Sequence, residues 1–128
     1  MFKILSLILL SSLALNAHVN VMVTDDTEIN NTSKQELSNL YLKKTTELKG
    51  KKVTVINNKK NYDEFNKKVL NKTPSQIHAY WMKQIFLGKK VPPKNIEQES
   101  LKGEISNKKN TIIYSSEKLD KKVIYETH

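Results

Sequence analysis

Short runs rich in β-branched residues alternate along this chain with helix-start signals, and no other feature limits the possible folds as strongly. The runs typical of strands fall at 18–23, 53–56, 111–114 and 122–125. In the first of them, apolar and polar residues alternate with the period of two expected of a strand. Strands separated by helices are typical of an α/β sandwich with a partly parallel sheet. We therefore predict an α/β fold in which helices flank a mixed sheet.

Three polar clusters have the spacing that caps the first turn of a helix. At 33–36 and 73–76 a hydroxyl residue is followed three positions later by Glu or Gln, and Pro74 takes a first-turn position where its missing N–H costs nothing. Asn61 and Glu64 form the third signal. Apolar residues at helical spacing predict the three buried faces: Leu37, Leu40 and Tyr41; Tyr62, Phe65 and Val69; Ile77, Tyr80, Trp81, Ile85 and Phe86.

Turn signals and one weaker helical pattern complete the expected order of elements. Gly50 predicts a turn before the strand at 53–56, Gly88 predicts the end of the third helix, and residues 91–93 predict an extended connector. Residues 98–108 predict a further helix that buries Leu101 and Ile105. The helical spacing predicts that Trp81 belongs to the core, and the alternative is a surface anchor that stacks on a sugar or a partner.

The first residues have the order of a secretory signal peptide. Lys3 precedes a twelve-residue apolar run at 4–15, and the small residue Ala17 follows directly before His18. The alternative is a membrane anchor, but twelve residues span only about 18 Å as a helix, short of the roughly 30 Å hydrocarbon core. We expect residues 1–17 to be cleaved and residues 18–128 to form one periplasmic domain with no stable membrane span.

The charge and the residue types exclude several kinds of site. All 22 basic residues are lysine and the chain has no cysteine, which excludes disulfides, thiolate metal sites, cysteine nucleophiles and arginine forks. Residues 34–94 carry 15 lysines and four acids, a balance that suits anionic ligands, polyanions or an acidic membrane surface. These lysines are scattered in pairs without interleaved aromatics, so we expect no nucleic-acid partner. The alternative is a plain solvated lysine surface.

Several stretches together resemble a known family. They are Ser-Lys-Gln-Glu-Leu from Ser33, Phe-Asn-Lys-Lys-Val-Leu from Phe65, Thr-Pro-Ser-Gln-Ile-His-Ala-Tyr-Trp at 73–81, Ile-Phe-Leu-Gly-Lys at 85–89 and Pro92-Pro93. In this order the chain resembles the short periplasmic proteins related to the phosphate-binding proteins of ABC transporters, in the type II periplasmic-binding-protein-like superfamily. The resemblance implies a single lobe of that fold over 18–128. It also implies a small oxyanion such as phosphate as ligand, and a membrane transporter, a sensor or another periplasmic protein as partner.

The chain departs from the family pattern where that pattern would hold an anion. The family's arginine before the aromatic of its second helix is replaced by Tyr62, and its closing Gly-x-Ile-Gly-Tyr strand is Asn-Thr-Ile-Ile-Tyr at 110–114. Where full-length phosphate binders have a Ser-Gly-Thr loop, this chain has Asn58, Lys59, Lys60 and Asn61. A helix start supplies free N–H groups and a positive dipole end. These four residues are therefore the candidate anion site, and the alternative is an ordinary polar turn with a helix cap.

The remaining chemistry is sparse, and we expect no enzyme, no cofactor and no metal. His18, His78 and His128 lack the spacing of metal ligands, and Asp25 and Asp26 lack the spacing of a calcium loop. Two functions remain open. The first is a solute-binding-like protein with weak or lost anion binding; the second is a non-transport interaction protein that reuses the fold as a docking surface.

Overall fold

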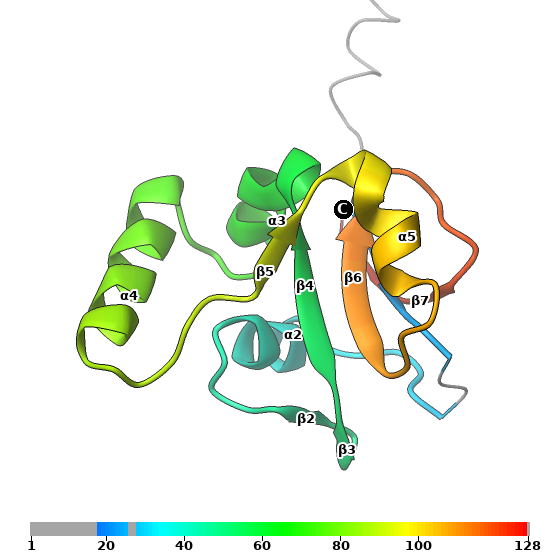
Figure 1. Cartoon of the computed structure of the whole chain (residues 1–128), viewed down its shortest axis with the longest axis horizontal. Coiled ribbons are helices and arrows are strands. Elements are labelled where there is room, and N and C mark those ends of the chain that lie inside the picture. The colour runs from blue at the N-terminus through cyan, green and yellow to red at the C-terminus, as the bar shows by residue number, and fades with distance from the viewer. Residues whose placement is uncertain (1–17, 26–27, 128) are drawn as a thin grey trace, which may run out of the picture.

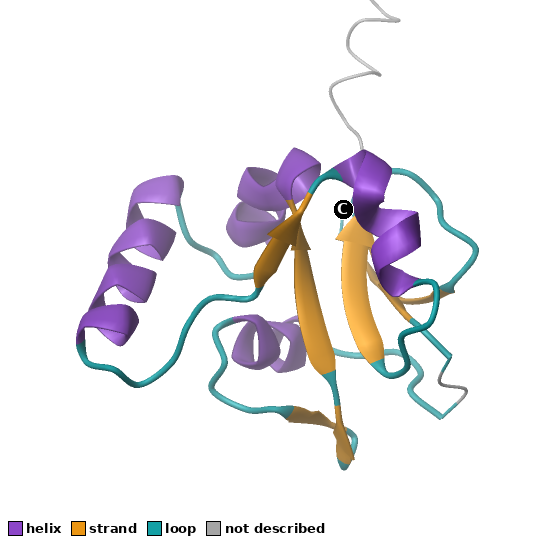
Figure 2. Ribbon diagram, in the orientation of Figure 1, coloured by secondary structure: helices purple, strands orange, loops and turns teal. Residues whose placement is uncertain are grey.

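A five-stranded mixed sheet forms the centre of the computed structural model, which describes residues 18–25 and 28–127 (Figures 1 and 2). Its strands are β1 (Asn20–Val23), β4 (Thr54–Asn58), β5 (Lys94–Ile96), β6 (Thr111–Ser115) and β7 (Lys122–Glu126), in the order β5-β4-β6-β1-β7. Strand β4 is parallel to β5 and β6, whereas β1 is antiparallel to β6 and β7. The α/β class and the partly parallel sheet predicted from the sequence are therefore confirmed.

Four α-helices surround this sheet in the part of the chain that the structure describes. They are α2 (Lys34–Tyr41), α3 (Tyr62–Lys68), α4 (Pro74–Phe86) and α5 (Leu101–Ile105), and 3-10 turns precede two of them at Lys59–Asn61 and Gln98–Ser100. Both predicted capping boxes are present: Ser33 pairs with Glu36 at the start of α2, and Thr73 pairs with Gln76 at the start of α4. The third cap is different, because the side chain of Asn61 makes no capping bond and Asn58 caps the preceding 3-10 turn.

Successive residues of the central strands point to opposite sides of the sheet, and both sides are covered. On β1 and β6 the side chains of Val21 and Ile112 join the core under α2, α3 and α4, while Met22 and Ile113 join a second core under α5. All five residues of β6 are buried for this reason. When both sides of a sheet are covered, its central strand is buried on both sides and its sequence shows no alternation of apolar and polar residues.

Helix α4 differs most from its sequence expectation. Ile77 and Trp81 are buried, as the spacing predicts, but Tyr80 is only half-buried, Ile85 is 48% exposed and Phe86 is 90% exposed. The helix lies beyond β5 at the edge of the sheet (Figure 1), so no part of the described chain lies against the exposed side chains of its C-terminal half. The prediction that Ile85 and Phe86 are core residues was therefore wrong. Tyr62 on α3 is likewise half-buried rather than buried.

Two elements were not predicted. Strands β2 (Glu47–Leu48) and β3 (Lys51–Lys52) form a hairpin in which Lys49 and Gly50 both have positive φ, the pattern of a type I′ turn. The turn predicted at Gly50 is present, although it joins these two strands. Strand β5 directly follows the connector predicted at 91–93, and its three residues carry no apolar alternation that would have predicted a strand.

Candidate functional site

The four residues of the candidate anion site follow the carboxyl end of β4. Asn58 is the last residue of β4, and Lys59–Asn61 form the 3-10 turn that leads into α3. The carboxyl end of the parallel neighbour β6 lies beside it, because β4 and β6 are paired in the sheet. Ligands of open α/β sheets bind at this edge. The residues predicted from the sequence therefore stand where a ligand site belongs.

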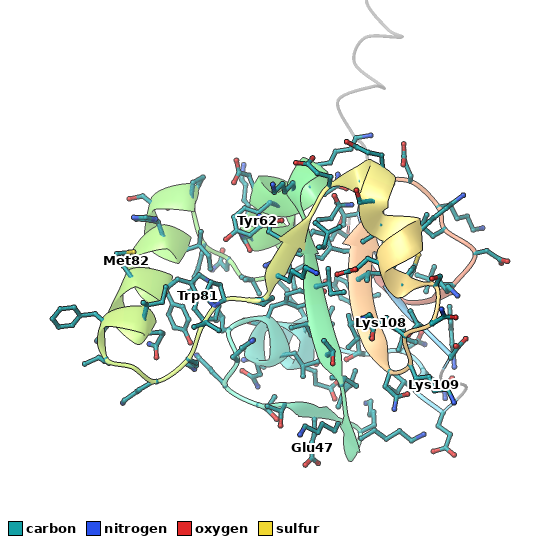
Figure 3. The ribbon with its side chains drawn as sticks, in the orientation of Figure 1. Glu47, Tyr62, Trp81, Met82, Lys108 and Lys109 are labelled. Atoms are coloured by element: carbon teal, nitrogen blue, oxygen red, sulfur yellow. The ribbon has the colours of Figure 1, made fainter. Side chains whose placement is uncertain are left out.

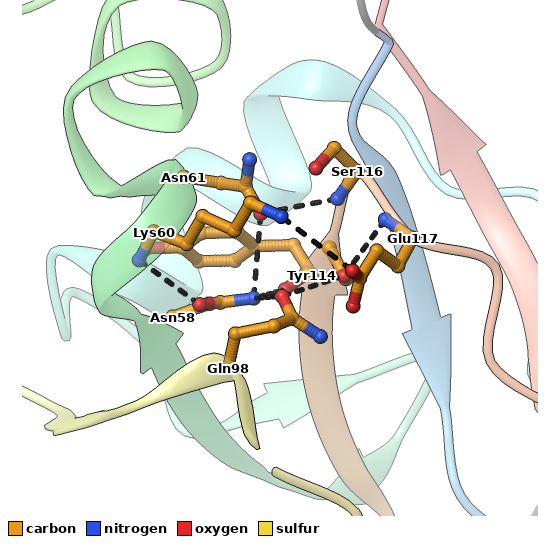
Figure 4. A network of polar contacts seen from close by, with 8 residues as sticks. Asn58, Lys60, Asn61, Gln98, Tyr114, Ser116 and Glu117 are labelled. Carbon is orange, nitrogen blue, oxygen red and sulfur yellow. Dashed lines mark hydrogen bonds and ion pairs between the residues drawn. The ribbon is translucent and has the colours of Figure 1, made fainter. Parts of the chain in front are cut away.

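The side chain of Asn58 is saturated by contacts within the protein. Its Nδ2 donates to the Tyr114 carbonyl at 3.0 Å, to Gln98 Oε1 at 2.6 Å and to Asn61 Oδ1 at 3.3 Å (Figure 4). Its Oδ1 accepts the backbone N–H of Lys60 at 3.1 Å. Asn58 is fully buried. Both N–H groups of the amide are therefore used within the protein, and none is left to donate to an anion.

Asn61 and Ser115 extend this network across the sheet edge. Asn61 Oδ1 accepts the backbone N–H of Ser116 at 3.0 Å. The hydroxyl of Ser115 donates to Gln98 Oε1 at 2.9 Å and accepts the Glu117 N–H at 2.9 Å. The network therefore joins the turn after β4, the turn at 98–100 and the loop after β6. We call it the Asn58 network, and it comprises Asn58, Asn61, Gln98, Ser115 and the backbone of Tyr114 and Ser116.

Both lysines of the candidate site face carboxylates of this chain. Lys59 Nζ lies 3.1 Å from Glu97 Oε1, and Lys60 Nζ lies 3.5 Å from Glu117 Oε1. All four side chains are about half exposed, so each pair contributes little to stability. The carboxylates nevertheless occupy the positions that an anion would need. An incoming phosphate would meet the negative charges of Glu97 and Glu117 beside both lysines, and these charges would repel it.

The hollow nearest to the site is also balanced in charge. It has a volume of about 340 Å³, and its charged lining consists of Lys60, Lys102, Glu99 and Glu117. Two positive and two negative side chains give it no net attraction for an anion. A larger hollow of about 780 Å³ lies between α3 and the start of α4, where Lys68 is paired with Glu64 at 2.9 Å.

Aromatic rings form a rigid layer beneath the Asn58 network. Phe65 stacks on Tyr114 with ring centroids 3.8 Å apart, and Tyr41 meets Phe65 edge-on at 4.7 Å. The Tyr114 hydroxyl donates to Asn57 Oδ1 at 2.7 Å, and the Tyr41 hydroxyl lies 2.9 Å from the Ile56 carbonyl and 3.1 Å from the Ile112 carbonyl. Burial raises the pKa of both phenols well above 10. Both side chains stay neutral, and they hold the ends of β4 and β6 in place.

The sequence predicted a candidate site at 58–61 but not the residues that surround it. Gln98, Ser115, Glu97 and Glu117 lie far along the chain from Asn58, and only the order of the strands brings them together. None of them belongs to a motif in the sequence. The sequence therefore contains no signal from which the role of these residues could have been predicted.

Two further properties of the described residues bear on function. Within 18–25 and 28–127, no three His, Asp or Glu side chains lie close enough together to hold a metal ion. Over the same ranges no helix has both the length and the apolar character needed to cross a membrane. The signal-peptide prediction for residues 1–17 falls outside the described residues.

No family model matches the chain, and no curated protein matches it.

Proposed function

We propose that this chain is an exported periplasmic protein built as a single lobe of the periplasmic-binding-protein type, related to phosphate-binding proteins, whose anion site is closed by its own side chains. The observation that carries this proposal is the saturated Asn58 amide at the carboxyl end of β4. The mixed sheet and the Thr73–Gln76 helix start are compatible with the proposed relationship. Fold alone does not carry a function, so the proposal depends on the contacts at the site.

Weak anion binding follows from these contacts in two ways. The N–H of Lys60 in the first turn is taken by Asn58, and the two lysines are paired with Glu97 and Glu117. A small-molecule site also needs groups that converge from several sides, whereas this chain provides one edge of one sheet. Exposed lysine contacts alone would be screened over about 8 Å at physiological salt.

A thermal-shift titration with phosphate and sulfate tests the proposal. A site filled to about one hundred times its dissociation constant stabilises a fold by roughly 2.7 kcal/mol. We expect no such stabilisation, and a dissociation constant for phosphate well above about 1 μM. Tighter binding by the isolated chain would contradict the closed site and establish a solute receptor.

Substitution of the two carboxylates tests the cause of the weak binding. The double variant Glu97→Gln and Glu117→Gln removes two negative charges that face Lys59 and Lys60, so phosphate should bind more tightly than to the wild type. Glu47→Gln is the matched control, because this exposed glutamate lies on β2, away from the site (Figure 3). Equal phosphate affinity in all three proteins would show that the carboxylates do not close the site.

One observation favours the second candidate function, an interaction protein that reuses the fold as a docking surface. The C-terminal half of α4 exposes large apolar side chains that no described part of the chain covers. A photo-crosslinking residue at position 86, with one at position 123 on β7 as control, tests this function in cells. Docking on α4 predicts adducts from position 86 alone; equal labelling from both positions would contradict it.

A further inference from the structure

The end of α4 and the residues that follow it carry five exposed apolar side chains within ten positions of the chain. We call this group the α4 tip, and it comprises Met82, Ile85, Phe86, Leu87 and Val91. Phe86 is 90% exposed and Val91 is 62% exposed, values that large apolar side chains seldom reach in a group on a monomer surface. In Figure 3 Met82 lies on the outer side of α4 and Trp81 on the side that faces the sheet. The tip therefore projects away from the body of the protein.

A shallow apolar hollow continues this surface along the flank of α4. It has a volume of about 390 Å³, and Tyr62, Trp81, Met82, Ile85 and Pro92 contribute to its walls. Met82 and Ile85 thus belong both to the hollow and to the α4 tip. The apolar surface extends from the exposed helix end towards the buried core.

The segment that contains the α4 tip is rich in lysine. Residues 65–96 contain seven lysines and no acidic residue, and two of these lysines, Lys68 and Lys94, are paired with Glu64 and Glu104. Lys83 and Lys89 are exposed beside the tip, and Lys90 reaches back to the Lys43 carbonyl at 3.1 Å. A surface that combines exposed apolar side chains with the exposed lysines Lys83 and Lys89 fits an occupant that is both apolar and anionic. A second copy of this chain would bring like charges together at the same place.

The residue types around the tip favour a membrane over a protein as this occupant. Protein interfaces are depleted of Lys, whereas Lys83 and Lys89 are exposed beside the α4 tip. Segments that lie in a membrane interface combine Lys with exposed Phe and Leu, and their affinity depends on buried apolar area and on anionic lipid. Lysine side chains keep their ammonium groups at the headgroups while their aliphatic stems cover apolar surface.

We propose that the α4 tip inserts Phe86 and Leu87 into the interface of a membrane that contains anionic lipid, with Lys83 and Lys89 at the headgroups. This surface is separate from the Asn58 network, so the proposal stands whichever way the phosphate titration turns out. It rests on the second candidate function in one respect, because it names the partner for the docking surface on α4.

A tryptophan reporter at the tip tests the insertion in the full chain. The variant Phe86→Trp should show a blue-shifted emission with vesicles of equal parts phosphatidylcholine and phosphatidylglycerol, and quenching when the lipid chains are brominated. Val123→Trp, on β7 at the other edge of the sheet, is the matched control and should show neither change. Because the two variants share every other residue, membrane contacts made elsewhere in the chain cannot produce this difference. Absence of the shift in Phe86→Trp, or an equal shift in both variants, would overturn the proposal.

Charge variants of the Phe86→Trp protein test the lipid requirement. Lys83→Gln with Lys89→Gln should raise the lipid concentration at half-maximal shift about tenfold or more at low salt, because lysines near an anionic surface contribute strongly to binding. Lys108→Gln with Lys109→Gln, on the side away from α4, is the control and should change it little (Figure 3). An equal shift with phosphatidylcholine alone would overturn the anionic-lipid proposal. If vesicles give no shift and position 86 still crosslinks to a protein, the membrane proposal fails and the docking function stands.

Discussion

The role of Asn58 could be predicted only in part from the sequence, because several of its contacts are with residues far away along the chain. The sequence placed a polar turn at 58–61 and left open whether it binds an anion or caps a helix. The structure gives Asn58 a capping role, since its Oδ1 accepts the N–H of Lys60. The contacts to Gln98 and to the Tyr114 carbonyl span 40 and 56 residues of sequence, so they depend on the strand order and leave no local pattern.

The substitution Asn58→Asp tests whether this amide holds the sheet edge together. Aspartate keeps the shape but places an oxygen against the Tyr114 carbonyl and Gln98 Oε1, where Nδ2 now donates. We expect the free energy of unfolding in urea to fall by at least about 2 kcal/mol. Lys59→Ala, which removes an exposed ion pair, should change it by less than about 1 kcal/mol. Wild-type stability of Asn58→Asp would refute the structural role of the network.

The buried phenols predict a loss of stability in alkali. Because burial raises the pKa of Tyr41 and Tyr114 above 10, the folded chain keeps both protons after the unfolded chain has begun to lose them. The stability is complete below pH 10 and falls above it, by about 1.4 kcal/mol per pH unit for each tyrosine. Urea titrations at a series of pH values should show this slope halved in Tyr114→Phe. An unchanged slope would mean that Tyr114 ionises without unfolding.

At the scale of the elements, the sequence predicted where helices begin more accurately than which of their apolar side chains are buried. Capping boxes are local, so the two at Ser33 and Thr73 were found where they were expected. Burial depends on what lies opposite a helix. The apolar spacing of α4 continues to Phe86, but the sheet ends at β5, and the last turn of the helix has no surface to cover. Strand β5 was missed because parallel pairing with β4 defines it and its own residues do not.

Two alanine substitutions on α4 separate its buried side from its exposed side. Trp81 is 6% exposed and meets Tyr80 edge-on at 4.9 Å, so Trp81→Ala should lower the free energy of unfolding by roughly 3–5 kcal/mol. Phe86→Ala should leave it within about 0.5 kcal/mol of the wild type. Thermal or urea denaturation measures both. A large loss of stability in Phe86→Ala would show that the tip is covered in the folded protein.

At the scale of the whole molecule, the fold class was predictable and the strand order was not. Alternating strands and helices predicted a mixed α/β sheet, because that inference needs only the order of elements along the chain. The position of β1 between β6 and β7 depends on pairings over about 95 residues, such as Asn20 with Ser115. Sequence periodicity carries no information about partners at that distance.

The mass of the protein recovered from the periplasm tests the proposed export. If residues 1–17 are removed, mass spectrometry of the periplasmic fraction should find an N-terminus at His18 or within a few residues of it. Substituting Ala17 by a bulky residue should reduce this processing, since the cleavage site requires a small side chain. Recovery of the intact chain from the cytosol would contradict the export.

The pairing of β1 with β6 and β7 also determines when the sheet can form. The strand made first in the described chain has both of its partners among the strands made last, so a chain leaving the ribosome cannot complete its sheet until Glu126 has been synthesised. Closing loops of this length is slow, because the chain loses conformational entropy before the strand contacts that stabilise the sheet have formed. Such a chain lacks its complete sheet during most of its synthesis. If the chain is exported as proposed, that delay gives a translocation machinery, which threads unfolded polypeptide, the time to engage it.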